Sequence, residues 1–292
     1  GMVVRRAGLL PLALPLAWAL PLLYPWAGAQ HEQAFSALQQ PAFAQAWLSW
    51  PAFAARSLLF AVAGAWLMRS ALAPSLTRRR AALSMMLWAV LGSLAVADWL
   101  MSLRPGWRST GFALLVLCGH SLGGGAALVA WSARHLPERL AAPAPGGDPQ
   151  APPTGRDLGN LLLMLAMLWG YLGFMHFLII WSENLPAEIA WFVPRLQGGW
   201  WYVGFMLVAL QLGVPSVALL WRRVKDQPAT LGAVACLVLA AHVLDSVWLV
   251  LPSASPQGLA AWWLAPLCIA GMGLLLYAPM LAPPVGRWHA AA

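Results

Sequence analysis

Apolar residues in this chain occur in runs of about 20, and short polar stretches separate one run from the next. A helix rises about 1.5 Å per residue, so about 20 apolar residues cross the roughly 30 Å of hydrocarbon in a bilayer. The runs that approach or reach this length are residues 7–26, 51–68, 81–103, 111–133, 158–181, 200–221, 231–251 and 259–281. The pattern therefore predicts an all-α integral membrane protein with eight transmembrane helices.

The composition supports a membrane protein. Hydrophobic residues make up 61% of the chain and charged residues 9%, whereas soluble domains average about 45–50% and about 25%. The three cysteines all lie inside apolar runs without C-x-x-C spacing, and they are Cys118, Cys236 and Cys268. The sequence therefore predicts neither a disulfide framework nor a zinc site, and we expect the thiols to act as small packing groups.

The basic residues follow the positive-inside rule. Thirteen of the 17 Lys and Arg residues fall on one side of the alternating spans, and the other four are Arg56, Arg104, Arg108 and Arg195. We expect the richer side to be cytoplasmic, with both termini on it, because loops rich in Lys and Arg stay inside. The formal charge of +8 is then a topology signal, and no nucleic-acid partner is predicted because no basic stripe is present.

The first apolar run also has features of a secretory signal peptide. Arg5 and Arg6 precede its apolar core, and Ala27-Gly28-Ala29 matches an A-x-A cleavage site. We expect the run to be retained as a span because it is long for a signal peptide. Cleavage would leave seven spans.

A connection rich in Pro, Ala and Gly, within residues 141–157, divides the chain nearly in half. Such a composition is typical of linkers, so we expect helix bundles at residues 1–140 and 158–292. Asp98 near the end of the third span is followed directly by Trp99, and Asp245 near the end of the seventh is followed three residues later by Trp248. This similarity predicts two four-helix bundles that form a parallel pseudo-repeat.

Three titratable residues lie inside apolar runs at similar distances from the outer ends, and they are Asp98, His176 and Asp245. At 1.5 Å per residue, all three are expected roughly 8 Å below the outer surface. Ionisable groups in hydrocarbon are costly and by default functional. We therefore predict that these three are proton acceptors or relays.

Further polar and aromatic residues are expected beside these three. They are His242, Glu183, Asn184, Trp99, Trp181 and Trp248. Carboxylates, imidazoles and flat rings together suit a quinol head group, which must release two hydroxyl protons. The alternative is that the polar groups satisfy one another between helices, or that the acids pair with Arg104 and Arg108.

Two other chemistries are not favoured by residues in the fourth span. The string from Gly119 to Gly123 spells the G-x-S-x-G motif of lipases, but no strand of a soluble α/β sheet precedes it. We expect its small residues to form a close helix-packing face. A b-type haem would need paired histidines at matched depth, and His120 lies deeper than His176.

Several strings, in this order, resemble one known family. They are Asp98-Trp99-Leu100-Met101-Ser102-Leu103 with Trp107-Arg108-Ser109-Thr110, RDLGNLL from Arg156, LIIWSENLPAE from Leu178, and DSVWLVLP from Asp245. The chain resembles the second large membrane subunit of alternative complex III, the bacterial quinol:cytochrome c oxidoreductase. That subunit is related to polysulfide-reductase-type (NrfD-like) membrane anchors. The resemblance covers residues 48–284.

The resemblance implies a location in the bacterial inner membrane. The implied partners are a sister NrfD-like membrane subunit, an iron–sulfur subunit, c-type cytochrome subunits and a terminal oxidase. The implied substrate is menaquinol or ubiquinol, with haem, metal and iron–sulfur clusters in the partners and not in this chain. The alternative is a non-catalytic scaffold that links such a complex to a terminal oxidase. A third class, a secondary transporter, would place the acids nearer the midplane, between broken helices.

Overall fold

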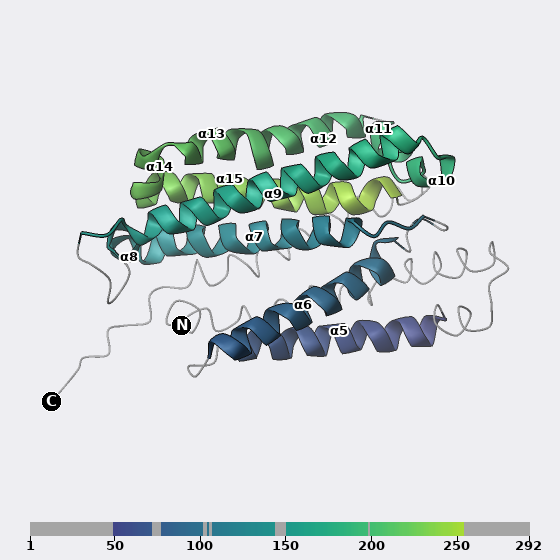
Figure 1. Ribbon diagram of the computed structural model, residues 1–292, viewed down its shortest axis with the longest axis horizontal. Helices are drawn as coiled ribbons and strands as arrows, with labels where there is room; N and C mark the ends of the chain where they lie inside the picture. Colours follow the sequence, from purple (N-terminus) through teal and green to yellow (C-terminus); the bar gives the residue numbers. More distant parts are fainter. Residues whose placement is uncertain are drawn as a thin grey trace.

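The computed structural model describes residues 49–71, 77–101, 104, 107–143, 150–197 and 199–253. Every regular element in these ranges is a helix, and they contain no strand. The long helices run side by side along the longest axis of the molecule (Figure 1). The described part of the chain is therefore all-α, as the sequence predicted.

Five helical segments are long and apolar enough to cross a bilayer, which supports a multi-pass membrane protein. They are α6 (Arg78–Trp99), α7 (Phe112–His135), α9 (Thr154–Glu183), the segment Trp200–Leu220 and α15 (Pro228–Val250). A further helix, α5 (Trp50–Ala71), occupies the second predicted span. The first and eighth predicted spans lie outside the described residues, so the total of eight stays a prediction.

Helix α7 lies at the centre of the described bundle, in contact with α6, α9 and α15 (Figure 1). A Cβ added at Gly123 would overlap the ring of His242, and one added at Gly232 would lie 2.7 Å from the Cβ of Ala133. Small residues allow such close packing in a bilayer, where no hydrophobic effect drives helices together. The predicted packing face is confirmed at Gly123, whereas Gly124 has nothing within 4 Å.

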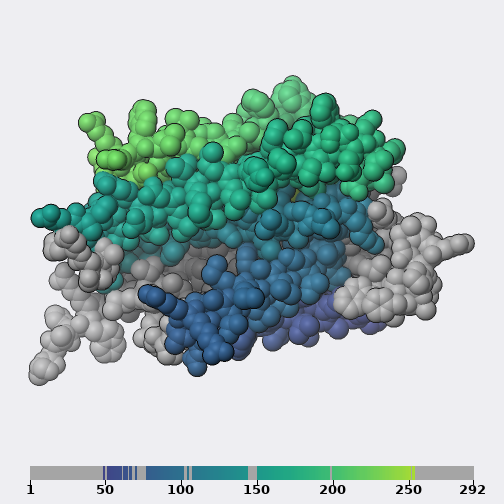
Figure 2. Space-filling model, in the orientation of Figure 1, coloured from purple at the N-terminus to yellow at the C-terminus, as the bar shows by residue number. Residues whose placement is uncertain are grey.

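The outward face of α9 carries large apolar side chains. The most exposed among them are Met164, Met167, Tyr171, Phe174 and Trp181. In Figure 2, α9 (teal) lies across the front of the described bundle. A continuous apolar surface of this kind is rare on soluble monomers, and it suits contact with lipid.

The segment Trp200–Leu220 is not one continuous α-helix. It consists of α12 (Trp200–Leu207), a π-helical turn η3 (Val208–Gly213) and α13 (Val214–Leu220). The N–H of Val214 bonds to the carbonyl of Ala209, five residues back. The next residue, Pro215, has no N–H to donate. The sequence predicted a span at this place but not the break inside it.

Short helices close the two ends of the bundle. At one end lie α8 (Pro137–Ala141) and α14 (Arg222–Asp226), and at the other lie α10 (Pro186–Ile189) and α11 (Val193–Leu196) (Figure 1). The guanidinium of Arg156 donates two hydrogen bonds, of 2.8 and 2.7 Å, to the carboxylate of Asp226. Lys225 Nζ donates to Asn160 Oδ1 at 2.7 Å. These contacts hold α14 against the first turns of α9.

Candidate functional site

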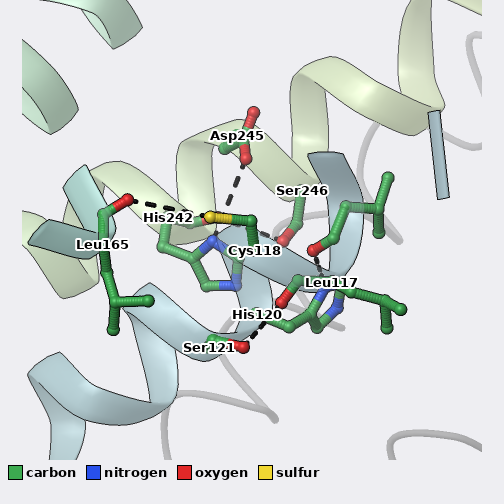
Figure 3. A network of polar contacts seen from close by, with 9 residues as sticks. Leu117, Cys118, His120, Ser121, Leu165, His242, Asp245 and Ser246 are labelled. Carbon is green, nitrogen blue, oxygen red and sulfur yellow. Dashed lines mark hydrogen bonds and ion pairs between the residues drawn. The ribbon is translucent and has the colours of Figure 1, made fainter. Parts of the chain in front are cut away.

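Asp245 is enclosed by residues from four segments of the bundle. Its side chain on α15 is almost completely buried, with a relative exposure of 4% for the residue. His242, one turn earlier on α15, has its Nδ1 3.9 Å from Asp245 Oδ2 (Figure 3). The side chains of Gln211 in η3 and Trp169 in α9 approach the same carboxyl group. A Cβ added at Gly119 of α7 would lie 3.4 Å from Oδ2, so the absence of a side chain there leaves room beside the carboxyl.

The residues beside the Asp245 carboxyl stand at different heights on their helices. Trp169 stands midway along α9 (Thr154–Glu183) and Gln211 near the middle of the segment Trp200–Leu220, whereas Gly119 lies in the first half of α7. The depth of roughly 8 Å that was counted from the end of one helix stays a prediction.

Two histidines extend this cluster from α15 to α7. The ring of His242 packs over Gly123, and its centroid lies 5.3 Å from that of His120 (Figure 3). Nδ1 of His120 lies 2.8 Å from the carbonyl oxygen of Val116 and is placed to donate a hydrogen bond to it. Nδ1 of His242 is buried and has no hydrogen-bond partner in the described ranges. The sequence raised His120 as a haem ligand, and the structure places it beside His242.

Ser121 does not form a nucleophilic site. Its hydroxyl donates to the carbonyl of Leu117 at 2.8 Å, one helical turn back (Figure 3). The residue lies in the middle of α7, and no strand precedes it among the residues that the structure describes. The geometry of a nucleophile elbow requires such a strand and a sharp turn. The motif is therefore a helical coincidence.

Asp98 forms an ion pair on the other side of α7. Arg56 of α5 donates from Nε to Oδ2 and from Nη2 to Oδ1, both at 2.8 Å, and both side chains are largely buried. The indole of Trp99 donates to Ser57 at 3.0 Å. The sequence named Arg104 and Arg108 as possible partners, and the structure pairs the acid with Arg56 instead. Asp98 lies in the last turn of α6, which ends at Trp99.

His176 lies in an aromatic cluster at the end of the bundle that carries α10 and α11. Its ring centroid is 6.1 Å from those of Trp107 and Trp191, and its Nδ1 is 3.4 Å from the hydroxyl of Ser109. Nε2 is buried and unpaired within the part of the chain that is described. His176 is therefore placed among rings, as a head-group site would require, but these rings are not the predicted ones.

The predicted neighbours of His176 are divided between the surface and the aromatic cluster. Trp181 is 67% exposed on the surface of α9, and Glu183 is exposed at the end of that helix. Asn184 caps α9 in the left-handed region, with φ of 51°. Trp248 donates from its indole to the carbonyl of Trp200 at 3.3 Å, and its ring lies 5.5 Å from that of Trp191, so it borders the cluster that contains His176.

Arg195 was expected in an exposed outer loop, and it is buried. Its guanidinium donates to the carbonyls of Trp191 and Leu249, each at 2.6 Å, and to Ser253 of η4 (Leu251–Ser253) at 3.0 Å. It also lies 3.5 Å over the Trp191 ring. Burial, with a smaller contribution from Arg104, lowers the pKa of Arg195 to about 9. Trp191 and Arg195 are four residues apart, about one helical turn, and this spacing was the sequence signal that could have indicated their contact.

The predicted site residues thus fall into three neighbourhoods. Asp98 belongs to an ion pair between α5 and α6, His176 to the aromatic cluster, and Asp245 to a polar cluster between α7, α9, η3 and α15. Within the described ranges, no group of three His, Cys, Asp or Glu side chains is arranged to hold a metal ion. Buried Cys118 donates weakly to the carbonyl of Leu165 at 3.7 Å, which suits a packing role.

No model of a known protein family matches this chain, and a search of curated proteins also finds no match. The relation to respiratory membrane subunits therefore rests on the sequence strings described above. The arrangement of the polar residues has to be interpreted from its own chemistry.

Proposed function

We propose that this chain is a membrane subunit of a bacterial respiratory quinol:cytochrome c oxidoreductase, and that it carries protons near the quinol site. The observation that supports this function is the buried Asp245, with His242, His120 and Gln211 around it. Quinol oxidation releases two protons, and carboxylates and imidazoles are the groups that accept them. An acid buried within a bilayer is costly, and it is by default functional.

The closed form of the cluster favours a proton path over a quinol pocket in this chain. The carboxyl of Asp245 is buried among residues from α7, α9, η3 and α15. A path needs only titratable groups at short distances. Quinol, either menaquinol or ubiquinol, would then bind in or next to the sister NrfD-like subunit, and the redox cofactors would belong to the iron–sulfur and c-type cytochrome subunits.

A scaffold that links the complex to a terminal oxidase is the second candidate. It is favoured by the Arg56–Asp98 pair, in which a predicted proton acceptor is held in an ion pair. Both proposals place the chain in the bacterial inner membrane with cytoplasmic termini. They differ in whether a change at Asp245 affects turnover or only assembly.

The test is the quinol:acceptor activity of the purified, intact complex that carries Asp245→Asn. The amide keeps the shape and hydrogen bonding of the acid but removes its titration. If Asp245 carries protons, turnover should fall by about 10²–10⁴, as is typical of lost general acid–base function, while the complex still assembles. Turnover close to wild type would refute the proton path and leave the scaffold.

A further inference from the structure

The π-helical turn directs a polar side chain to the core of the bundle. Within η3, Val208 is 53% exposed whereas Gln211 is fully buried. An extra residue in a helical turn changes which face the following residues present, and such turns occur frequently at functional sites. Pro215 just after the turn cannot supply the backbone hydrogen bond of a regular helix. The break therefore presents an amide to Asp245 in an otherwise apolar segment.

Three buried polar atoms near Asp245 lack a hydrogen-bond partner among the residues that the structure describes. Neither Oε1 nor Nε2 of Gln211 has a partner of hydrogen-bond geometry among the described residues, although its side chain approaches the carboxyl. The same holds for Nδ1 of His242. Buried polar groups are nearly always hydrogen-bonded, either to protein or to ordered water. Three unpaired atoms beside one carboxyl group therefore indicate a shared small ligand.

The distances suit a bridging water molecule. The 3.9 Å between Asp245 Oδ2 and His242 Nδ1 is too long for a direct hydrogen bond, and polar contacts across such gaps are commonly bridged by water. We propose that water binds between Asp245, His242 and Gln211, and that Gln211 is the positioning residue that holds it and orients the carboxyl. The inferred water site rests on the proposed function and deepens it, because the water joins Asp245 and His242 into one proton relay.

Infrared difference spectroscopy of the full chain in lipid nanodiscs tests this arrangement. The carboxyl C=O band of Asp245 is assigned by its loss in Asp245→Asn, at a pH low enough to protonate the group. Gln211→Leu should move this band to higher wavenumber, because a C=O bond stretches at higher frequency when it loses a hydrogen bond. It should also remove a water O–H band that shifts in heavy-oxygen water. Val208→Leu, in the same turn but exposed, should change neither band.

A second variant covers the case in which Gln211→Leu does not fold. Gln211→Asn keeps the amide on a shorter stem, and a smaller shift of the Asp245 band is expected. An unchanged Asp245 band in either variant, or a water band that persists in Gln211→Leu, would overturn the inference. Neither measurement uses quinol, so a failure of the proposed function in the activity assay would be distinguished from a failure here.

Discussion

Gly123 and Gly124 offer a matched test of the packing that holds His242 in place. The two glycines are adjacent in α7, but a Cβ at Gly123 would overlap the His242 ring, whereas a Cβ at Gly124 meets nothing within 4 Å. Both changes to alanine gain the same helix propensity, about 0.8–1.0 kcal/mol. The difference between the two variants therefore isolates the steric cost.

Overpacking a close contact by one methyl costs about 1–3 kcal/mol. Gly123→Ala should be less stable than Gly124→Ala by that amount, which is roughly a 5- to 150-fold difference in the unfolding equilibrium at 1.4 kcal/mol per factor of ten. The free energy of unfolding is measured in mixed micelles with increasing denaturing detergent, followed by circular dichroism. Equal stabilities of the two variants would show that α7 and α15 do not pack closely at His242, and would refute the geometry of the cluster.

Three other outcomes test the remaining contacts. Arg56→Gln should destabilise the chain by about 3–5 kcal/mol, because it removes the guanidinium that donates two hydrogen bonds to the largely buried Asp98 carboxylate. Turnover per assembled complex should stay unchanged, and a specific loss of turnover would contradict this. Hydrogen bonding by Arg156 lowers the pKa of Asp226 below its ordinary 3.8. The Arg156–Asp226 pair therefore stabilises the fold above pH 3.8, and this stabilisation is lost as the pH falls through the lower pKa of the folded state. In Asp226→Asn, the free energy of unfolding should not show this loss on acidification. Ser182→Cys should react with an impermeant thiol reagent from the periplasm and Ser75→Cys should not; the reverse pattern would overturn the orientation.

The helices could be predicted because the length of an apolar run is a local property of the sequence. The ends of α7, α9 and α15 lie within a few residues of the predicted spans, since the polar residues that end each run are visible in the chain. The break at η3 was not predicted, although Gly213 and Pro215 are close together in that run. Small residues and prolines occur in many unbroken membrane helices. Their presence therefore did not indicate where the backbone hydrogen-bond pattern of the helix would be interrupted.

The site residues were recognised by type, but their partners were not. Asp98 and Arg56 are 42 positions apart, and only the packing of α5 on α6 brings them together. Arg195 was read as an outer-loop cation because it lies outside the predicted spans. Its burial depends on the fold of α11 over the end of α15, where two backbone carbonyls accept its hydrogen bonds. Such tertiary pairings are not encoded in hydrophobic periodicity.

The two aspartates of the predicted pseudo-repeat differ in the chemistry of their partners. Each meets a polar residue from the preceding span, but Asp98 meets Arg56 and Asp245 meets Gln211. A guanidinium stays charged at any physiological pH, so protonation of Asp98 would break its ion pair with Arg56. An amide offers hydrogen bonds to either form of a carboxyl group and carries no charge.

The partner of each aspartate should therefore decide whether that aspartate holds the fold together or moves protons. An arginine beside Asp245 should turn Asp245 from a proton carrier into a structural ion-pair partner. In Gln211→Arg, therefore, the complex should assemble but lose the proton-dependent turnover that Asp245→Asn also abolishes, and retained turnover would show that the partner of Asp245 does not control it.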